Sequence, residues 1–507
     1  MISPRVAVIG AGVSGLASIK ACLEENLDVI CYERSSTIGG LWCYDENKRN
    51  VTSCMKCTVM NSSKVLTSFS DFPMPEDYPL YCPHELVLKY LQSYMEHFDL
   101  LKNIKYNQEI ELMEQNENGT WKLTIRDADQ NIKIETFDKV MVCSGFRNVL
   151  NMPDYDTSKF KGEILHAANY RTSEPYRNKN VLVVGVGPSA ADCASDLVDV
   201  AKNVYLSNRS GAWLITRVVN GSQSLEGALL QRFTYAVLPY LPNWYDEYYF
   251  RKTLRSFVDP WLHYLPPKHG PAEHELLISD SLPSLLMTQK VKVCGEIDKF
   301  TDNGVIFKSG VHKEIDAVVF CTGYLIKFHF IKDKQLIQDI INPDNNQLGL
   351  HKYIFPPNNP HPGSISFIGI LTTFGSMFPV IEHQARYAAK IFSGQTKLPS
   401  RIEMLEDIKK RQVIAMTLYK NGQMGRTSIY ENWHAYLDDL SSLIGCKPNF
   451  VKIALTDPRL FYTLFFGLPS PSVYRLTGKH SWPKARETIL AMNEQILPRD
   501  KQIPVND

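Results

Sequence analysis

Residues 5–40 constrain what this chain can fold into more than any other stretch. Residues 6–9 (VAVI) form an apolar, β-branched run typical of a strand that is buried on both faces. A glycine-rich turn, a segment with helical spacing (16–23) and a second strand (29–32) follow, and the second strand ends at Glu33. This order predicts a Rossmann-type dinucleotide-binding unit. The residues of the turn are Gly10, Ala11, Gly12, Val13, Ser14 and Gly15.

Each part of this stretch has a mechanical role in such a unit. Gly10 permits the tight turn, Gly12 lets a pyrophosphate approach the backbone, and Gly15 lets the helix pack closely on the strand. The N-terminus of the helix supplies N–H donors for the phosphates. Glu33 follows the glycines by about 20 residues, the spacing at which an acid accepts a hydrogen bond from a ribose 2′-hydroxyl.

A second pair of glycines lies just beyond Glu33. Gly39 and Gly40 are followed by Leu41 and Trp42, where an extended cofactor would continue past its pyrophosphate. This placement favours FAD over a smaller nucleotide, with Gly40, Leu41 and Trp42 as contacts. An ordinary turn with a core tryptophan is the alternative.

The same pattern returns after residue 180. An apolar strand (180–184) leads into a turn, a helix is expected over 191–200, and a strand over 203–206. When the two units are superimposed on their first glycines, Asn208 lies opposite Glu33, with Arg209 beside it. Loss of the acid and gain of a guanidinium favour a 2′-phosphate and therefore NADP(H), although a solvated surface arginine is the plainer interpretation. The contacts predicted in this unit are Gly185, Gly187, Ser189, Ala190, Ala191, Asp192 and Arg209.

Composition bounds the class of protein. The chain has 507 residues, 44% of them hydrophobic, and a net charge of +1, so no charge excess points to nucleic acid as a partner. No stretch approaches the ~20 apolar residues that span a bilayer. The first strand begins too early for a signal peptide. Eleven cysteines without an export signal predict reduced thiols in an intracellular protein.

The remaining elements place the motifs in two domains. We expect an α/β fold with two Rossmann-like dinucleotide-binding domains, one for FAD and one for NADPH, the second carrying a mainly helical insertion. The predicted boundaries are 1–152 plus 325–435 for the FAD domain, 153–213 plus 290–324 for the NADPH domain, 214–289 for the insertion and 436–507 for a C-terminal helical segment. Further predicted helices cover 84–98 and 382–392, and further predicted strands cover 104–114, 121–126, 132–137, 139–143, 291–294, 304–307, 317–324 and 366–370.

A fingerprint between the two glycine turns identifies a family. Residues 160–170 (FKGEILHAANY) resemble the FxGxxxHxxxY sequence of the flavin-containing monooxygenases. Other segments resemble family segments in the same order over nearly the whole chain. They are residues 38–42, 61–64, 71–73, 209–213, 322–324, 384–388, 455–458, 474–476 and 482–483.

The resemblance implies a chemistry and its residues. NADPH would reduce FAD, O₂ would add to give a C4a-hydroperoxyflavin, and a soft nitrogen or sulfur of an amine or sulfide would take the terminal oxygen. The family assigns protection of that oxygen to NADP⁺ and to the asparagine matching Asn61, the predicted catalytic residue. An amide suits this position because it donates and accepts hydrogen bonds without supplying an acidic proton. Met60 and Gln384 are the other cofactor contacts that the resemblance implies.

This sequence departs from the family pattern at several positions. Met60 stands where a small hydroxyl residue is common, which could alter the substrate side of the flavin. Pro188 and Ala190 replace an asparagine and the third glycine, and Cys321 replaces an alanine. Because the cofactor carries the chemistry, no metal site is expected, and His166 is interpreted as structural.

Location and assembly stay open at this level. Animal relatives usually end in a hydrophobic anchor, so the resemblance implies the cytosolic face of the endoplasmic reticulum membrane, or the cytosol if the lack of an anchor is natural. Residues 229–241 and 461–468 are apolar stretches that could contact a membrane peripherally, and burial in the core is the preferred interpretation. A homo-oligomer is an open alternative.

Three other functions compete with oxygenation of amines or sulfides. Cys54 and Cys57 form a CxxC pair, as in disulfide reductases that use FAD and NADPH, but that class places its dithiol elsewhere. A Baeyer–Villiger monooxygenase usually closes the fingerprint with Trp where Tyr170 stands. An NADPH oxidase that never oxygenates a substrate is the third alternative.

Overall fold

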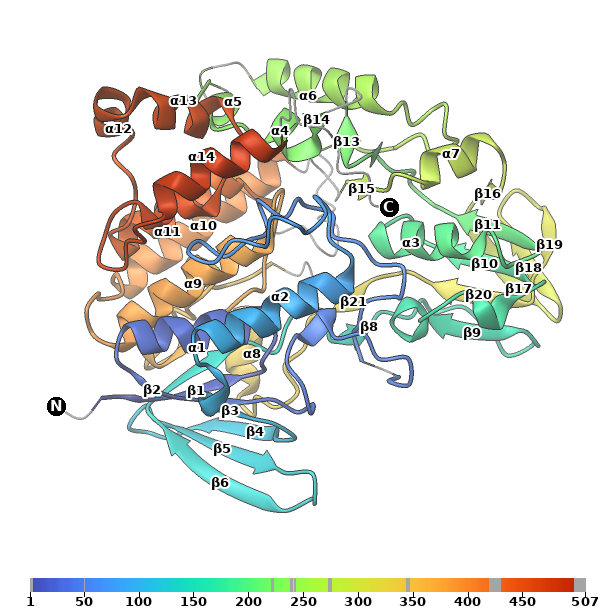
Figure 1. Cartoon of the computed structure of the whole chain (residues 1–507). Coiled ribbons are helices and arrows are strands. Elements are labelled where there is room, and N and C mark those ends of the chain that lie inside the picture. Colours follow the sequence, from blue (N-terminus) through green and yellow to red (C-terminus); the bar gives the residue numbers. More distant parts are fainter. Residues whose placement is uncertain are drawn as a thin grey trace.

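The chain folds around two parallel sheets on opposite sides of the molecule (Figure 1). The computed structural model describes residues 3–49, 51–219, 223–237, 240, 243–271, 276–342, 347–418 and 430–496. In the first sheet the strand order is β22-β7-β1-β2-β3, and all its pairs are parallel. Its strands are β1 (Arg5–Ile9), β2 (Asp28–Tyr32), β3 (Ile104–Lys105), β7 (Lys139–Val142) and β22 (Ile365–Phe367).

Two helices cover the central strands of the first sheet. α1 (Val13–Glu24) follows β1, and α9 (Met377–Phe392) packs on α1. The chain therefore returns to its first unit after more than half its length, through β22 and α9. The return was predicted around residues 366–392.

The second sheet repeats the arrangement of the first. Its order is β16-β11-β10-β20-β9, with the strand that precedes the second glycine turn again in the middle. In each unit a three-stranded antiparallel sheet precedes the strand that flanks the glycine strand. The elements of the second unit are β9 (Glu163–His166), β10 (Asn180–Val184), α3 (Pro188–Leu197), β11 (Asn203–Ser207), β16 (Val291–Cys294) and β20 (Ala317–Phe320). The antiparallel sheet of the first unit consists of β4 (Glu109–Gln115), β5 (Trp121–Arg126) and β6 (Ile132–Phe137). That of the second unit consists of β17 (Ile297–Thr301), β18 (Gly304–Phe307) and β19 (His312–Glu314).

The two connections between the units lie side by side. β8 (Val149–Leu150) leaves the first unit, β21 (Tyr324–Leu325) returns to it, and the two strands pair antiparallel. This pairing joins the places where the chain was predicted to cross between domains.

Helices make up most of the regular structure in the described part of the insertion, together with two-residue strands. β12 (Leu214–Ile215) near its start pairs in parallel with β15 (Leu277–Ile278) near its end, so its two ends are adjacent. These two-residue strands leave no periodic pattern in the sequence. The other elements are β13 (Val218–Val219), β14 (Gln223–Ser224), α4 (Leu225–Leu229), α5 (Arg232–Val237), α6 (Asn243–Phe257) and α7 (Leu282–Met287).

The remaining helices complete the molecule. α11, α12, α13 and α14 form its upper left part in Figure 1. α11 crosses the boundary that was predicted at residues 435 and 436. These elements are α2 (His84–His97), α8 (Lys334–Ile340), β23 (Thr372–Thr373), α10 (Arg401–Leu418), β24 (Tyr430–Glu431), α11 (Trp433–Ile444), α12 (Phe450–Thr456), α13 (Pro458–Phe466) and α14 (Ala485–Ile496), with single turns of 3-10 helix at Gly40–Trp42, Leu101–Asn103, Ala167–Asn169, Glu174–Tyr176, Pro362–Ser364 and Pro471–Arg475.

Local chemistry explains where predicted elements differ from observed ones. The strand predicted over 104–114 breaks into β3 and β4 because Asn107 takes a left-handed conformation (φ 53°) between them. α3 begins earlier than predicted, since Pro188 fits the first helical position. α9 also begins early: Ser376 caps it, and Pro379 lies in the first turn, where its missing N–H breaks no helical bond.

A buried arginine fastens the C-terminal segment to the first unit. The Arg475 guanidinium is 1% exposed and donates to Ser70 Oγ (2.7 Å) and Glu382 Oε1 (2.9 Å). It also contacts Asp71 Oδ2 (3.0 Å) and Glu24 Oε1 (3.1 Å). Breaking such a buried network strands a charge, which costs about 3–5 kcal/mol. The segment is therefore tied to α1, α9 and the loop at residues 70–71.

The two glycine turns share one constraint. Gly10 has φ +99° and Gly185 has φ +121°, both unfavourable for other residues. A β-carbon on Gly10 would lie 2.8 Å from Cys143 O, and one on Gly185 would lie 2.5 Å from Cys321 O. Each turn is thus pressed against the end of the neighbouring parallel strand.

The second glycine of each turn is not pressed in this way. A β-carbon on Gly12 would make ordinary contact with Gly40 (3.5 Å from Cα and 3.8 Å from N), and one on Gly187 would meet no described atom within 4 Å. Gly187 also has ordinary backbone angles (φ −94°, ψ 179°). No described residue therefore demands glycine at position 187. The predicted role of Gly187, to leave room for a pyrophosphate, stays a prediction.

Gly187→Ala separates binding from folding. We expect the variant to keep its FAD and its melting temperature, because the added methyl group meets no described atom. The Kd for NADP⁺ should rise about tenfold or more, since a methyl group would hold a pyrophosphate off the backbone. Titration of the FAD-loaded protein with NADP⁺ measures this, and an unchanged Kd would show that position 187 does not face the dinucleotide.

Candidate functional site

Glu33 braces the first glycine turn. Its carboxylate is buried, Oε2 accepts from Ala11 N (2.7 Å), and Oε1 accepts from Ser35 N (2.8 Å) and Ser35 Oγ (2.6 Å). A carboxylate has about four lone-pair sites, so these bonds leave room for a further donor. The predicted contact between Glu33 and a ribose hydroxyl stays a prediction, and the structure adds that Glu33 fixes the shape of the turn.

Glycines from three segments form a cradle beside this turn. Gly40 has φ +54°, and a β-carbon there would lie 3.2 Å from Gly12 Cα. A β-carbon on Gly369 would lie 2.5 Å from Ser14 Oγ. Bare backbone therefore meets at one spot, which fits the diphosphate of FAD. Ser14 is buried in the cradle, and Val13, Leu41 and Trp42 lie along its edge with partly exposed side chains.

Gln384 supports this cradle through a hydrogen bond to the backbone of Gly369. It is fully buried, its Oε1 accepts from Gly369 N (2.8 Å), and its Nε2 donates to Tyr436 Oη (2.8 Å). Both ends of the amide already have protein partners. The predicted contact between Gln384 and a cofactor stays a prediction, and the structure places Gln384 as a support for Gly369.

The segment from Cys54 to Asn61 runs between the two units. Cys54 N donates to Leu41 O (3.0 Å) beside the first cradle, and Cys57 Sγ lies 3.9 Å from Asp192 O on α3. The segment ends at Asn61, the predicted catalytic residue. Asn61 thus lies at the end of a segment that contacts both units.

The insertion holds this segment through Arg217. The Arg217 side chain is buried, and Nη2 donates to Asn61 Oδ1 (2.9 Å). Nε donates to Met60 O (2.9 Å), and Nη2 also donates to Val59 O (3.3 Å). On its other side, Nη1 forms an ion pair with Asp280 Oδ2 (2.8 Å). Met60 itself is buried, with only its backbone carbonyl turned to Arg217.

A second contact between the insertion and this part of the chain lies next to Arg217. Glu226 on α4 is buried, and its Oε1 accepts from Ser63 N (2.5 Å). Tyr81 Oη lies 3.2 Å from Glu226 Oε2 and donates to Arg217 O (2.7 Å). Burial raises the pKa of Glu226 above its usual range, and the hydrogen bonds that it accepts oppose this shift.

The start of α3 carries the predicted contacts of the second unit. Ser189, Ala190, Ala191 and Asp192 follow Pro188 at its N-terminal end, with Ala190 and Ala191 fully buried. Ala190 stands where Gly15 stands in the first unit. Burial raises the pKa of Asp192 to about 6, although the nearby charge of Arg217 opposes the shift.

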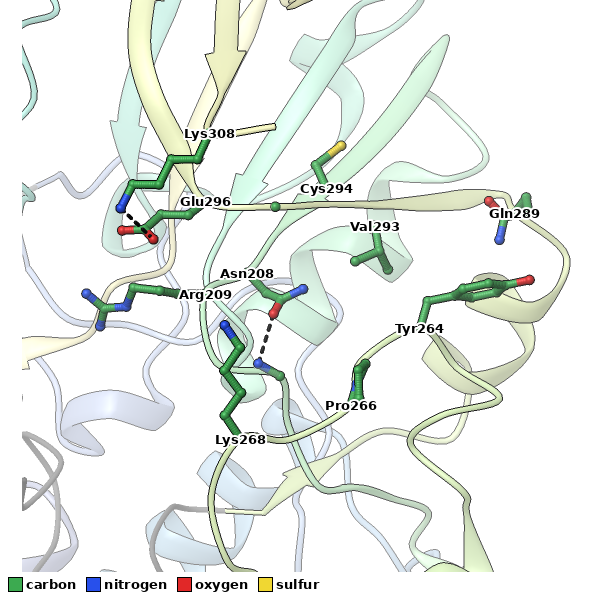
Figure 2. A pocket seen from close by; sticks show the side chains of 12 residues that line it. Asn208, Arg209, Tyr264, Pro266, Lys268, Gln289, Val293, Cys294, Glu296 and Lys308 are labelled. Carbon is green, nitrogen blue, oxygen red and sulfur yellow. Dashed lines mark hydrogen bonds and ion pairs between the residues drawn. The ribbon is translucent and has the colours of Figure 1, made fainter. Parts of the chain in front are cut away.

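A pocket of about 580 Å³ lies at the carboxyl ends of β11 and β16 (Figure 2). Arg209, Lys268 and Lys308 line it, and Figure 2 shows their side chains on the same side of it. Lys308 Nζ pairs with Glu296 Oε2 (2.9 Å), and Asn208 Oδ1 accepts from Gly211 N (2.9 Å). The carboxyl edge of a parallel sheet is where nucleotides bind in such folds.

His166 and Tyr170, two residues of the fingerprint, form hydrogen bonds within the second unit. His166 is buried, and its Nδ1 accepts from Ala168 N (3.1 Å) while Nε2 lies 3.0 Å from Gly323 O. Nε2 therefore carries the proton, and burial lowers the pKa of His166. Tyr170 Oη donates to Asp196 Oδ2 (2.7 Å). This geometry agrees with a structural role for His166.

The CxxC pair lacks the features of a redox dithiol. Cys54 and Cys57 are free thiols. Burial raises the pKa of Cys54 to about 11 and that of Cys57 to about 12, so both are poor thiolates. Within the part of the chain that the structure describes, no group of three or more His, Cys, Asp or Glu side chains could hold a metal ion.

Several residues of this site escaped the sequence analysis, among them three from the insertion. Arg217, Glu226 and Lys268 all come from the insertion, whose motifs gave no chemical signal. Arg217 lies four residues beyond the family-like segment 209–213, which is the nearest hint that the sequence offers.

Comparison with known proteins agrees with this arrangement. The family model described as "Flavin-binding monooxygenase-like" matches residues 3–505. The chain is 35% identical over 505 residues to flavin-containing monooxygenase 5 of Cavia porcellus, covering 98% of this chain and 93% of that protein. It is 34% identical to dimethylaniline monooxygenase (N-oxide-forming) 2 of the same species, with the same coverage.

Solved structures share the fold. S-allyl-L-cysteine S-oxygenase from Allium sativum superimposes with a TM-score of 0.65 at 22% identity, over 96% of this chain and 99% of that one. Cyclohexanone monooxygenase from Rhodococcus sp. Phi1, bound to NADP⁺, superimposes with a TM-score of 0.63 at 16% identity, over 88% and 98%. The chain belongs to the flavin-binding monooxygenase-like family and is an oxidoreductase of the monooxygenase type, with FAD and NADP(H) as its cofactors.

Proposed function

We propose that this protein uses NADPH and O₂ to oxygenate the nitrogen or sulfur of small, soft nucleophiles such as amines and sulfides. The observation that carries the proposal is Asn61, held at the end of a segment that touches both nucleotide units. A relative named as N-oxide-forming and a structural neighbour named as an S-oxygenase support this substrate class.

The two units divide the cofactors between them. Gly10, Gly12, Glu33 and Gly40 would hold FAD, and Gly187 with the start of α3 would hold NADPH. Bound FAD supplies the chemistry that protein side chains lack, taking a hydride from NADPH and activating O₂. The protein must bind both nucleotides, orient them and keep water and protons from the reacting centre.

Asn61 is suited to such a centre. Its amide is neutral at every physiological pH and donates hydrogen bonds without giving up a proton. Arg217 occupies the amide oxygen, and within the described ranges no protein group accepts from the amide nitrogen. Asn61 Nδ2 is therefore free to donate to a bound cofactor.

Asn61→Ala tests the proposed function directly. The FAD-loaded wild type should convert NADPH, O₂ and a thioether or tertiary amine into sulfoxide or N-oxide with little hydrogen peroxide. In the variant, hydrogen peroxide per NADPH should rise by up to about tenfold, because one hydrogen bond contributes about 0.5–1.5 kcal/mol and about 1.4 kcal/mol corresponds to a factor of ten. Product analysis with peroxide detection measures both quantities.

The control and the opposing outcomes are clear-cut. Asn118→Ala, in the exposed turn between β4 and β5, should leave peroxide release unchanged. Conversion of a ketone to an ester, without oxidation of amine or sulfide, would make the protein a Baeyer–Villiger enzyme. NADPH consumption that yields peroxide alone with every substrate would make it an oxidase.

The pocket of Figure 2 supports a preference for NADPH over NADH. Arg209 and Lys268 are cations at the carboxyl edge of the second sheet, where the 2′-phosphate of the adenosine would lie. Lys308 already balances Glu296 and adds less net charge. We propose that Arg209 contacts this phosphate, with Lys268 as a second cation.

Arg209→Ala should change cofactor preference more than overall activity. We expect the KM for NADPH to rise about tenfold or more, as loss of a charge-assisted hydrogen bond implies, while the KM for NADH changes little. Arg209→Lys, which keeps the charge, should give an intermediate value. An equal loss for both cofactors would remove Arg209 from the phosphate site.

An exposed apolar patch supports peripheral contact with a membrane. It consists of Val451 and Leu455 on α12, Tyr462 and Phe466 on α13, and Phe233 on α5. The stretches 229–241 and 461–468 were expected to be core, and among their described residues this holds for inward side chains such as Leu230 and Leu464. Residues 238, 239 and 241 lie outside the described residues. Among the described helices, none is both long and apolar enough to cross a bilayer.

We propose that this patch rests on a phospholipid surface, where apolar side chains enter the headgroup region. Leu455→Ser combined with Tyr462→Ser should lower the fraction that sediments with phospholipid vesicles by about half or more, since each buried apolar side chain contributes to binding. Ile132→Ser, at an exposed apolar position on β6, is the matched control. Equal sedimentation of all variants would exclude the patch. The predicted endoplasmic reticulum location stays a prediction.

A further inference from the structure

Arg217, a residue of the insertion, reaches the Asn61 segment. It lies between β12 and β13, and its guanidinium donates to three consecutive residues of that segment, Val59, Met60 and Asn61. The first two bonds go to backbone carbonyls, and the third goes to the side chain of Asn61. A single side chain therefore fixes both the path of the segment and the amide at its end.

The chemistry of arginine determines which way the Asn61 amide faces. A guanidinium only donates hydrogen bonds, so the atom of Asn61 that lies 2.9 Å from Nη2 must be the oxygen. The amide nitrogen then points away from Arg217. Without the guanidinium, both orientations of the amide would be open to Asn61, and only one of them offers a donor to a bound cofactor.

Asp280 fixes Arg217 in turn. Asp280 Oδ1 accepts from Arg217 N (2.8 Å), and Oδ2 accepts from Nη1 (2.8 Å), so the carboxylate grips both backbone and side chain. The side chain of Asp280 is 53% exposed. Removal of Arg217 would leave Asp280 in water rather than stranded in the core, so a variant without the guanidinium can still fold.

We infer that Arg217 is a positioning residue for the proposed oxygenation: it orients the Asn61 amide, so that the insertion, rather than the FAD unit alone, determines how the flavin site is shielded. The inference rests on the proposed function of Asn61. The grip of Glu226 on Ser63 acts next to it but does not reach Asn61. The two contacts can therefore be tested separately.

The first experiment is a double-mutant cycle on the FAD-loaded, full-length protein. Arg217→Met keeps the length of the side chain and removes its donors. If Arg217 acts through Asn61, Arg217→Met and Asn61→Ala should each raise hydrogen peroxide per NADPH, and the double variant should match the worse single variant within about twofold, because neighbours in one network are not additive. Arg217→Lys should lie between Arg217→Met and the wild type. Additive effects, or wild-type coupling in Arg217→Met, would overturn the inference.

A second measurement does not depend on turnover. Hydrogen–deuterium exchange of peptides covering residues 59–63 should increase in Arg217→Met, with peptides from β1 and β10 unchanged. Glu226→Gln should loosen the same peptides without changing the orientation of Asn61, and so should affect peroxide release less than Arg217→Met does. Arg255→Met, on the exposed side of α6, is the charge-matched control.

Failure of the proposed function and failure of the role of Arg217 would give different results. If the wild type never oxygenates an amine, sulfide or ketone, the proposed function is wrong, while exchange at residues 59–63 still shows whether Arg217 holds the segment. If the wild type oxygenates its substrate but Arg217→Met changes neither exchange nor coupling, the proposed function stands and the role of Arg217 is wrong.

Discussion

The close approach of α1 to β1 is the constraint on which the rest of the structure depends. A β-carbon on Gly15 would lie 1.9 Å from Gly10 O, so no larger residue fits there without moving the helix. The approach aims the N-terminus of the helix at the turn and leaves Gly12 and Gly40 as bare backbone facing each other. Phosphate binding at such a site uses backbone N–H groups and the helix dipole, so it depends on the path of the backbone rather than on charged side chains.

The second unit has a turn of the same kind with different residues after it. Ala190 replaces the third glycine, and Pro188 starts α3. The turn is nevertheless anchored in the same way, since Gly185 is pressed against Cys321 as Gly10 is pressed against Cys143. Two copies of one architecture thus differ in the residues at the start of the helix.

Buried polar contacts join these units to the insertion and the C-terminal segment. Arg217 and Glu226 hold the Asn61 segment, and Arg475 holds the loop at residues 70–71. In a low-dielectric interior, such contacts are strong when every partner is present and costly when one is missing. These contacts bury little apolar surface, but they restrict the units to one arrangement. A site that lies between two units requires such a fixed arrangement. The same restriction would let the insertion act on the Asn61 segment in the way proposed for Arg217.

The sequence by itself determined the elements whose signals are local. The strand, glycine turn, helix and second strand of each unit lie within about 30 contiguous residues, so spacing alone identified them. Pairing of Asn61 with Arg217, 156 positions away, and of Ser70 with Arg475, 405 positions away, left no such signal. β17 and β19 were missed because short, largely polar strands show no alternation. The sequence did not predict that Lys268 lines the pocket at the ends of β11 and β16, because only the folding of the insertion brings it there. Local periodicity encodes local structure, whereas the partner of a buried polar group is decided by how distant segments pack.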